Sequence, residues 1–395
     1  DIDTIITALQ PQLTVSKAAS PAGGDNIIVD NELVTYTLKV TNVGTAPAYY
    51  LLLEDIIPVG MRNGAATITM VSTTLAGNTV ADVAPLYNPL TGVVTWNFDS
   101  GVADAYTIGV AETLTVVYQV QADANVSAGI TLANAARGFS YYSFDNDAEP
   151  VLGGVTGVRE VYGPTNTAVV TLNSTPAGAL DKANPADLTV AVGETFTYRI
   201  SVPATPIDVA LYDVRIVDDL SASAADLSFV SVTKVSGSLP WTPVNTGSIT
   251  NLVIEDSTDG IDIPVGEQVV IDITVQVDDT ATNVSGLTFS NTATYTFNQF
   301  DNNPATQQNG LPDTTADMTI VGPDNLTLEK SGPPTMRLGV PGTFYLNVHN
   351  TGTAAAYDLV ITDQIPNPVP GGMCDVAPNN FTAQIYLADG VTAVG

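Results

Sequence analysis

The sequence is poor in the residue types on which disulfide-rich, zinc-binding and many catalytic proteins depend. Its 395 residues include one cysteine, Cys374, and one histidine, His349. A disulfide framework within the chain and a Cys/His zinc site are therefore both excluded. A Ser-His-Asp triad would have to use His349, which we expect at the end of a strand. The sequence thus argues against most enzyme classes, and we expect no enzymatic activity.

Positive charge and long apolar runs are also scarce. There are 11 basic residues against 41 acidic ones, which gives a formal net charge of −30. Such a surface repels nucleic acid and anionic membranes, so nucleic acid is not an expected partner. No stretch approaches the roughly 18 uninterrupted apolar residues of a membrane span. We therefore expect no membrane insertion within this chain.

The residues that are abundant favour strands and turns. Apolar residues make up 45% of the chain, which is enough to form buried cores. Thr, Val, Ala, Asn and Gly dominate, whereas long charged helix formers are few. Many short runs of alternating apolar and polar residues, separated by turn residues, are typical of β-sandwiches. The expected fold class is all-β, with tandem immunoglobulin-like β-sandwich domains.

One short stretch recurs three times and marks a long internal repeat. Three of the five lysines occupy the same repeat position, in Leu13 to Lys17, Leu180 to Lys182 and Leu326 to Lys330. In each copy a strand of alternating apolar residues follows, and then a second strand that ends in Asp. These second strands are expected at Tyr49 to Asp55, Tyr212 to Asp218 and Tyr357 to Asp363. Lysine is otherwise avoided, so its placement here points to a specific role.

The repeats predict an arm followed by serial domains. We assign residues 1–11 to an N-terminal arm and residues 12–175 to a first β-sandwich repeat with an acidic insertion. Residues 176–322 form the second repeat, and residues 323–395 form a third that is incomplete. Repeats of this length fit autonomous domains better than solenoid units. A linear string of such domains is typical of a stalk or fibre.

Each repeat places charged or amide side chains on a strand face that we expect to point into the core. Side chains two apart on a strand share a face, and the apolar neighbours identify this face as the buried one. An unpaired charge there is expensive, so each Lys and each Asp needs a partner. The residues are Lys17, Asp55 and Asn134 in repeat one, Lys182, Asp218 and Asn291 in repeat two, and Lys330 and Asp363 in repeat three.

Two arrangements satisfy these buried groups. The first is a buried Lys–Asp ion pair capped by Asn. The second is covalent, because a desolvated Lys has a lowered pKa and becomes a neutral amine nucleophile, while a desolvated Asp has a raised pKa and becomes an acid. The amine attacks the Asn carboxamide, ammonia leaves, and a Lys–Asn isopeptide bond remains. Proximity in a dry core suffices for this reaction, so no cofactor is required.

The order of these motifs resembles that of bacterial surface proteins. Residues 180–300 resemble the isopeptide-forming D2-type domain of bacterial fimbrial and surface proteins. Repeats one and three resemble the related surface repeat often called DUF11. The D2-type matches are Lys182, Val192 to Tyr198, Val202-Pro203, Val217 to Leu220 and Asn291 to Ala293. The DUF11-type matches are Leu13 to Lys17, Tyr36 to Gly44, Glu54 to Pro58, His349 to Gly352 and Thr362 to Pro366.

The resemblance implies tandem immunoglobulin-like sandwiches at an extracellular cell surface. It carries the bond-forming roles onto Lys182, Asp218 and Asn291, and by position onto the corresponding residues of repeat one. We interpret the chain as a structural subunit of a stalk, pilus or sheath, stiffened by autocatalytic Lys–Asn bonds. Its expected partners are copies of itself in a homopolymer or other surface-protein subunits. An adhesin or Ca²⁺-dependent binding module is the alternative, and a secreted hydrolase would require a deep pocket with convergent carboxylates.

Two further classes of site are suggested by local sequence. Asp145, Asp147 and Asp301 lie in oxygen-rich loops that recur near the repeat ends, and such loops are typical of Ca²⁺ ligands. An Asx-rich turn explains the same residues without an ion. Five Asn-x-Ser/Thr sequons permit glycosylation in a secreted setting, although several arise by chance in a chain rich in Thr and Asn. They are Asn125, Asn173, Asn283, Asn325 and Asn380.

Overall fold

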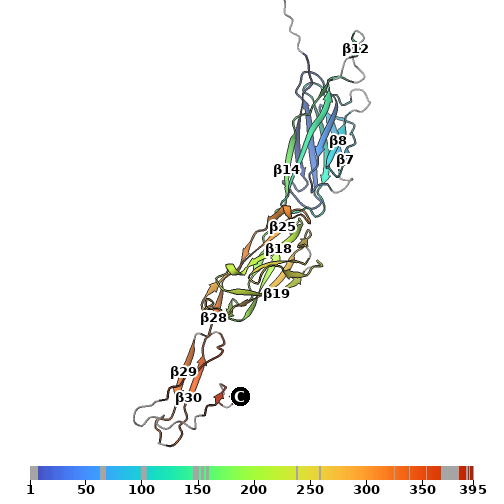
Figure 1. Cartoon of the computed structure of the whole chain (residues 1–395). Coiled ribbons are helices and arrows are strands. Elements are labelled where there is room, and N and C mark those ends of the chain that lie inside the picture. Colours follow the sequence, from blue (N-terminus) through green and yellow to red (C-terminus); the bar gives the residue numbers. More distant parts are fainter. Residues whose placement is uncertain are drawn as a thin grey trace, which may run out of the picture. The chain divides into compact units, whose positions relative to one another are not determined.

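The fold is all-β, as the sequence predicts (Figure 1). The computed structural model describes residues 8–62, 68–98, 105–145, 151–152, 155–156, 160–236, 239–257, 259–323, 325–337, 339–352, 354–365, 382–387, 390 and 392–394. Besides strands, these residues form two short 3₁₀ helices, η2 (Leu220–Ala222) and η3 (Pro304–Thr306). No helix within these ranges is long and apolar enough to cross a membrane.

The chain divides into two compact units, Asp1–Val321 and Gly322–Gly395. The first unit contains two β-sandwiches. We call residues 13–174 the first sandwich and residues 181–321 the second sandwich, and we call the second unit the C-terminal unit. The boundaries at residues 175 and 322 proposed from the sequence stay a prediction.

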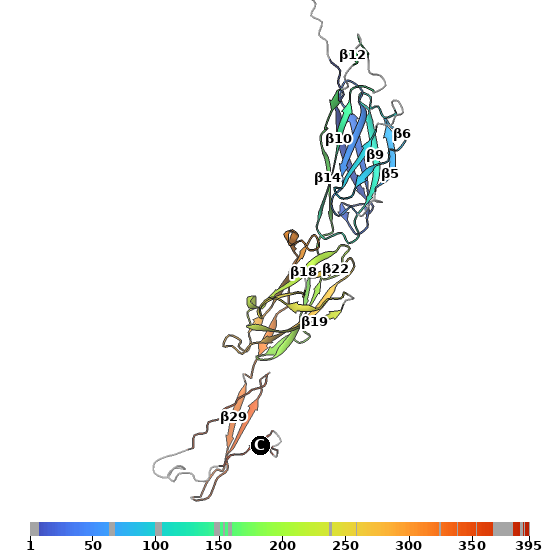
Figure 2. The same cartoon turned by 45° about the vertical axis from the view of Figure 1, so that its right-hand side comes forward.

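The first sandwich consists of two sheets (Figure 2). One has the order β1 (Leu13–Pro21), β3 (Leu33–Asn42), β9 (Thr113–Gln121), β5 (Thr69–Leu75) and β6 (Asn78–Val80). The other has the order β2 (Ile27–Ile28), β14 (Ala168–Ser174), β10 (Thr131–Tyr142), β4 (Tyr49–Ile56), β8 (Val93–Asn97) and β7 (Leu86–Asn88), with β13 (Val161–Tyr162) paired to β10. The strands β11 (Val151–Leu152) and β12 (Val155–Thr156) form a separate hairpin in the insertion.

The second sandwich repeats this plan. One sheet has the order β15 (Asp181–Ala183), β17 (Thr195–Val202), β23 (Val269–Val277) and β19 (Leu227–Ser236). The other has β20 (Pro243–Asn245), β21 (Asn251–Asp256), β18 (Leu211–Asp219), β25 (Thr292–Asn298) and β26 (Gln307–Asn309), with β22 (Ile261–Ile263) on β18 and β27 (Asp313–Thr314) on β25. A third set joins β16 (Thr189–Ala191), β28 (Met318–Val321) and β24 (Thr288–Phe289). The parallel pair β16–β28 matches the parallel pair β2–β14.

The cores form where the alternating strands turn their apolar side chains inward. On β3, Tyr36, Leu38 and Val40 are fully buried, and the residues between them are more exposed. Tyr36 stacks on Tyr118 of β9 with ring centroids 5.4 Å apart, and Trp96 packs on Tyr118 at 5.1 Å. Full burial of each large apolar side chain contributes about 1.5–3 kcal/mol. The period-two pattern of the sequence therefore determines both the strands and the side that packs.

The pairing registers of the two sandwiches are equivalent at the positions that matter for the site. Lys17 lies opposite Leu38, and Lys182 lies opposite Ile200. Asp55 lies opposite Ala136, which follows Asn134 by two residues. Similarly, Asp218 lies opposite Ala293, which follows Asn291 by two residues. The same three side chains are thus presented to each core from equivalent positions of the repeat.

The C-terminal unit is built differently from the sandwiches. Its pairs are β29 (Leu326–Ser331) with β30 (Tyr345–Asn350) (Figure 1) and β31 (Ile385–Tyr386) with β32 (Ala393–Val394). All six residues of β29 are exposed. The expected strand from Tyr357 to Asp363 does not form, so that prediction is wrong. Its counterparts β4 and β18 pair with β10 and β25, and among the described residues no strand of this unit takes that partner's place.

Candidate functional site

The second sandwich contains a buried array of one lysine, one aspartate and one asparagine. The side chains of Lys182 and Asp218 are both 0% exposed, and Lys182 Nζ lies 2.6 Å from Asp218 Oδ2. Asn291 Nδ2 donates to the other oxygen of the same carboxylate, Asp218 Oδ1, at 2.9 Å. One carboxylate therefore contacts both the amine and the amide.

The strands that flank this array hold each member in place. The backbone N–H of Lys182 donates to Asp313 Oδ2 on β27. Asn291 lies between β24 and β25, and its N–H and C=O bond to Thr315 Oγ1 and to the N–H of Thr315. These bonds satisfy the backbone at a point where the sheet ladder is interrupted, and they keep the Asn291 side chain in the core.

The first sandwich brings the equivalent residues together with one addition. Lys17 Nζ lies 2.5 Å from Asp55 Oδ2, and both side chains are 0% exposed. Tyr118 donates its hydroxyl hydrogen to Asp55 Oδ2. Asn134 Nδ2 in turn donates to the Tyr118 hydroxyl at 3.5 Å. The amide therefore reaches the carboxylate through a phenol, whereas Asn291 reaches its carboxylate directly.

One substitution between the sandwiches accounts for this difference. Tyr118 on β9 lies opposite Tyr36, and the residue opposite the matching Tyr198 is Ile273. Ile273 has no polar group to place between the carboxylate and the amide. Sequence reasoning did not select Tyr118 as a site residue. The sequence did indicate that Tyr118 is buried, because it shares one face of its strand with Leu114, Val116 and Val120.

Burial shifts the pKa values of the lysines and the aspartate in opposite directions. Desolvation lowers the pKa of Lys17 to about 8, against a smaller opposing effect of Asp55. Desolvation likewise lowers the pKa of Lys182 and raises the pKa of Asp55. Each ammonium also faces an aromatic ring, with Nζ 4.8 Å from the Tyr36 centroid and 4.3 Å from the Tyr198 centroid. Both shifts favour transfer of a proton from the amine to the carboxylate.

The amide oxygens of both arrays are left without partners. Within the part of the chain that the structure describes, Asn134 Oδ1 and Asn291 Oδ1 are buried and accept no hydrogen bond. A buried unsatisfied acceptor costs about 1–3 kcal/mol. A protonated aspartate would supply the missing donor if the amide turned over. Before a bond forms, each array therefore leaves the asparagine Oδ1 without a hydrogen bond. This oxygen is the atom to which a protonated aspartate would donate in order to activate the amide.

The lowered pKa of Lys17 predicts a pH-dependent stability. Because this pKa falls from 10.5 to about 8 on folding, the unfolded chain binds the extra proton between these values. The free energy of unfolding therefore rises as the pH rises from about 8 to 10.5, by at most about 3 kcal/mol. Below about pH 8 both states carry the proton, and the folded state bears the full cost of burying it.

Urea denaturation of the Asn134→Ala variant, in which no first-sandwich bond can form, measures this effect. The matched control is the triple variant Lys17→Met, Asp55→Asn and Asn134→Ala, which lacks the titrating pair. The difference in unfolding free energy between the two should change across the window from pH 8 to 10.5. A constant difference would contradict the assigned pKa.

The C-terminal unit pairs Lys330 with Asp363 but does not bury them. The two charged atoms lie 2.5 Å apart, and the side chains are 36% and 31% exposed. The expectation that these residues face a core is wrong in this unit, because the strands that would cover them are not among its described elements. Lys330 Nζ still lies 5.0 Å from the Phe344 ring, as its counterparts lie near Tyr36 and Tyr198.

Of the acidic loop residues predicted as calcium ligands, Asp145 and Asp301 have different surroundings in the structure. Asp145 accepts a hydrogen bond from the Tyr50 hydroxyl. Asp147 lies outside the described residues. Asp301 lies with Asp213 and Asp262, two carboxylates that the sequence analysis did not select. Their separation along the chain hid this grouping, which only the folded structure reveals.

The predicted glycosylation sites differ in accessibility. Asn125, Asn173 and Asn325 are exposed. Asn283 is buried, and its Nδ2 donates to the carbonyl oxygens of Asp226 and Asp278, so its amide acts as an internal cap in the folded chain. Asn380 lies outside the described residues.

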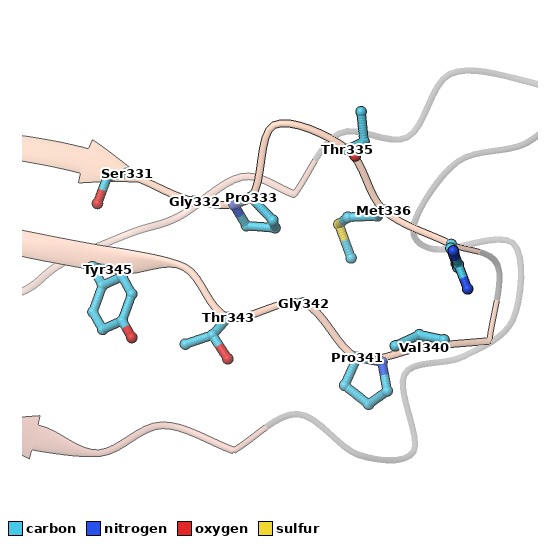
Figure 3. A pocket seen from close by; sticks show the side chains of 11 residues that line it. Ser331, Gly332, Pro333, Thr335, Met336, Val340, Pro341, Gly342, Thr343 and Tyr345 are labelled. Atoms are coloured by element: carbon cyan, nitrogen blue, oxygen red, sulfur yellow. The ribbon is translucent and has the colours of Figure 1, made fainter.

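A recess of about 530 Å³ opens in the C-terminal unit between the ends of β29 and β30 (Figure 3). It is lined by one connection, from Ser331 to Tyr345, and the only charged side chain among its lining residues is Arg337. A glycoside-hydrolase site requires paired carboxylates in a cleft. This recess contributes none, so it does not support the hydrolase alternative.

The chain has a distant structural likeness to several solved structures of bacterial proteins. No protein-family profile and no curated protein sequence matches the chain. It is similar in structure to the C-terminal domain of the Streptococcus agalactiae AgI/II polypeptide BspA, at 13% identity and a TM-score of 0.30 over 78% of this chain and 99% of the other. The Actinomyces fimbrial adhesin FimA is 12% identical, with a TM-score of 0.30 over 78% of this chain and 99% of the adhesin chain. A collagen-binding domain from a Staphylococcus aureus adhesin is 9% identical, with a TM-score of 0.23 over 40% of this chain and 97% of the domain. Likeness at this level carries no argument about function.

Proposed function

We propose that this protein is an extracellular structural subunit of a cell surface, such as part of a stalk, pilus or sheath. In this proposal it has no enzymatic activity on other molecules. Internal Lys–Asn isopeptide bonds in the first and second sandwiches stiffen it. Its partners are copies of itself or other surface-protein subunits, joined outside the cell.

The observation that carries this proposal is the second-sandwich array. Lys182 Nζ and Asn291 Nδ2 contact the two oxygens of one buried carboxylate, at 2.6 Å and 2.9 Å. A purely structural ion pair does not require a third polar group, and isolated buried ion pairs are weak sources of stability. Two equivalent arrays in one chain also argue against an accidental grouping. The arrangement suits a reaction within the core better than a simple salt bridge.

The reaction that this arrangement supports is balanced without a cofactor. The Lys ammonium passes one proton to the Asp carboxylate and becomes a neutral amine. Its nitrogen attacks the Asn Cγ, so a C–N bond forms and the Cγ–Nδ2 bond breaks. The amine gives a second proton to Nδ2, which leaves as ammonia. The products are an amide, a neutral aspartic acid and ammonia, so no net charge remains buried in the core.

An accurate intact mass of the denatured protein tests this proposal. The expected result is a deficit of two ammonia molecules relative to the sequence mass. Peptide mapping should then join Lys17 to Asn134 and Lys182 to Asn291. The variants Asn134→Ala and Asn291→Ala should each restore the mass of one ammonia, apart from the substitution itself.

The outcomes distinguish the two sandwiches. A deficit of one ammonia, with only the Lys182–Asn291 peptide, would confine the reaction to the second sandwich and identify the Tyr118 hydroxyl as the obstacle in the first. In that case Tyr118→Phe should restore the second deficit. An unmodified mass in the wild-type protein would leave both arrays as ion pairs and overturn the proposal.

A further inference from the structure

Three aspartates of the second sandwich converge at one place. Carboxylate oxygens of Asp213, Asp262 and Asp301 all lie within 4.8 Å of one another. Asp213 belongs to β18, Asp262 to β22, and Asp301 to the turn between β25 and η3. Asp213 is buried, and the other two are exposed, so the cluster opens to solvent on one side.

No basic side chain neutralises this cluster in the described part of the chain. None of the three aspartates forms an ion pair there, and Arg215 on the same strand pairs with Glu255 instead. Burial raises the pKa of Asp262, and the neighbouring Asp301 and Asp213 raise it further. Three carboxylates at this spacing repel one another, and a bound cation would relieve that repulsion.

A separate observation points to a ligand. Asn298 on β25 is only 2% exposed, and its Nδ2 donates to Asp213 Oδ2 at 2.6 Å. Its Oδ1 is buried and accepts no hydrogen bond from any described residue. An amide oxygen is a preferred ligand for hard cations. The amide turns Nδ2 toward Asp213, and with the amide turned over the unsatisfied Oδ1 would face the cluster, where a cation would be its partner.

We propose that Asp213, Asp262, Asp301 and Asn298 form a Ca²⁺ site. Calcium takes 6–8 oxygen ligands at about 2.3–2.6 Å, so ligands on opposite sides of the ion lie about 4.8 Å apart. The spacing of the three carboxylates fits within this limit. Water supplies the remaining ligands on the exposed side.

The first sandwich joins the corresponding positions by a direct hydrogen bond. Tyr50 occupies the position of Asp213, five residues before Asp55, and both residues have a positive φ, of 53° and 50°. The Tyr50 hydroxyl donates directly to Asp145, the counterpart of Asp301. A direct hydrogen bond thus links the strand to the following turn in the first sandwich. In the second sandwich the N–H of Asn302 donates to Asp213 Oδ2 at 3.0 Å, and the calcium ion adds a link to Asp301 of the same turn.

The site also lies beside contacts between the two sandwiches. Tyr212, next to Asp213, donates to the backbone oxygen of Asn125 at 2.8 Å. Gln299, next to Asn298, donates to the backbone oxygen of Gly129 at 2.9 Å. Calcium binding therefore orders Tyr212 and Gln299, which contact the first sandwich at Asn125 and Gly129. It stabilises this contact as well as the second sandwich.

Calcium titration of chelator-treated full-length protein tests the site. The expected result is one Ca²⁺ bound per chain, with a Kd of about 10⁻⁴–10⁻³ M, as in extracellular modules. At a calcium concentration about 100-fold above Kd, the unfolding temperature of the second sandwich should rise by about 5–10 °C. Asp301→Asn, an exposed substitution that leaves the core intact, should abolish both effects.

The control is Asp317→Asn, which removes the same charge from an exposed position outside the cluster. It should bind calcium as the wild type does. An unchanged titration in Asp301→Asn, no binding by the wild type at millimolar calcium, or an equal thermal shift with Mg²⁺ would overturn the proposal. The site does not depend on the isopeptide bonds, so intact mass and calcium binding fail or succeed independently.

Discussion

Asp218→Ala is expected to destabilise the second sandwich by at least about 3–5 kcal/mol, because it leaves the Lys182 ammonium buried without its partner. Both side chains are fully buried, so water cannot compensate for the lost carboxylate. The same variant should also retain the ammonia of Asn291, since no group remains to take the proton from the amine. Urea denaturation and intact mass measure the two effects in one sample.

Asp272→Ala is the matched control for this change. Asp272 pairs with Arg199 on the same sandwich, but the Arg199 side chain is 53% exposed. Exposed pairs contribute about 0–1 kcal/mol, so the control should lose little stability and no cross-link. If Asp218→Ala were no more damaging than Asp272→Ala, the Lys182–Asp218 pair would not be a central element of the core.

Asn291→Ala should produce the second large effect, by removing only the acceptor of the cross-link. The Lys182–Asp218 pair remains, so no charge is left unpaired. Linking Lys182 to Asn291 closes a loop of roughly 100 residues, and a cross-link of that length stabilises by about 5 kcal/mol in the chain-entropy model. The variant should lose about that much unfolding free energy relative to the wild type.

A comparison with Asn251→Ala distinguishes the stability lost with the Lys182–Asn291 bond from the stability lost on truncating an asparagine side chain. Asn251 is exposed on β21 of the same sandwich, so its truncation should change stability by less than about 0.5 kcal/mol. The Asn291 amide itself makes one hydrogen bond to a charged group, worth about 1.5–3 kcal/mol. A loss confined to that range, in a protein whose wild-type mass is unmodified, would show that no bond forms.

Tyr118 shows why equivalent sequence positions can differ in chemistry. Lys17, Asp55 and Asn134 match Lys182, Asp218 and Asn291 in their position in the repeat and in the burial of their side chains. One phenol on the neighbouring strand nevertheless moves the amide of Asn134 away from the carboxylate. Comparison of the two sandwiches within a single chain keeps solution conditions identical. It therefore tests the role of direct amide–carboxylate contact more cleanly than two separate proteins could.

The sequence by itself determined the all-β fold and the inward direction of the site residues in the first two repeats. Alternation is a local property with a period of two residues, so Lys17 and Asp55 could be assigned to the buried face from their apolar neighbours alone. The repetition of Lys182 and Asp218 in a second copy strengthened that assignment. The scarcity of lysine, histidine and cysteine removed most competing chemistries on composition alone.

Only the tertiary structure decided which groups actually meet. The contact of Asn291 with Asp218, and the phenol that separates Asn134 from Asp55, depend on pairing register and on one residue of a third strand. The meeting of Asp213 with Asp262 and Asp301 joins three segments that no local pattern relates. Lys330 carries the same local sequence signal as Lys17, yet it is partly exposed because burial requires strands that its unit does not supply among the described residues. Periodicity specifies the direction of a side chain, whereas its distance from a partner is set by how distant strands pack.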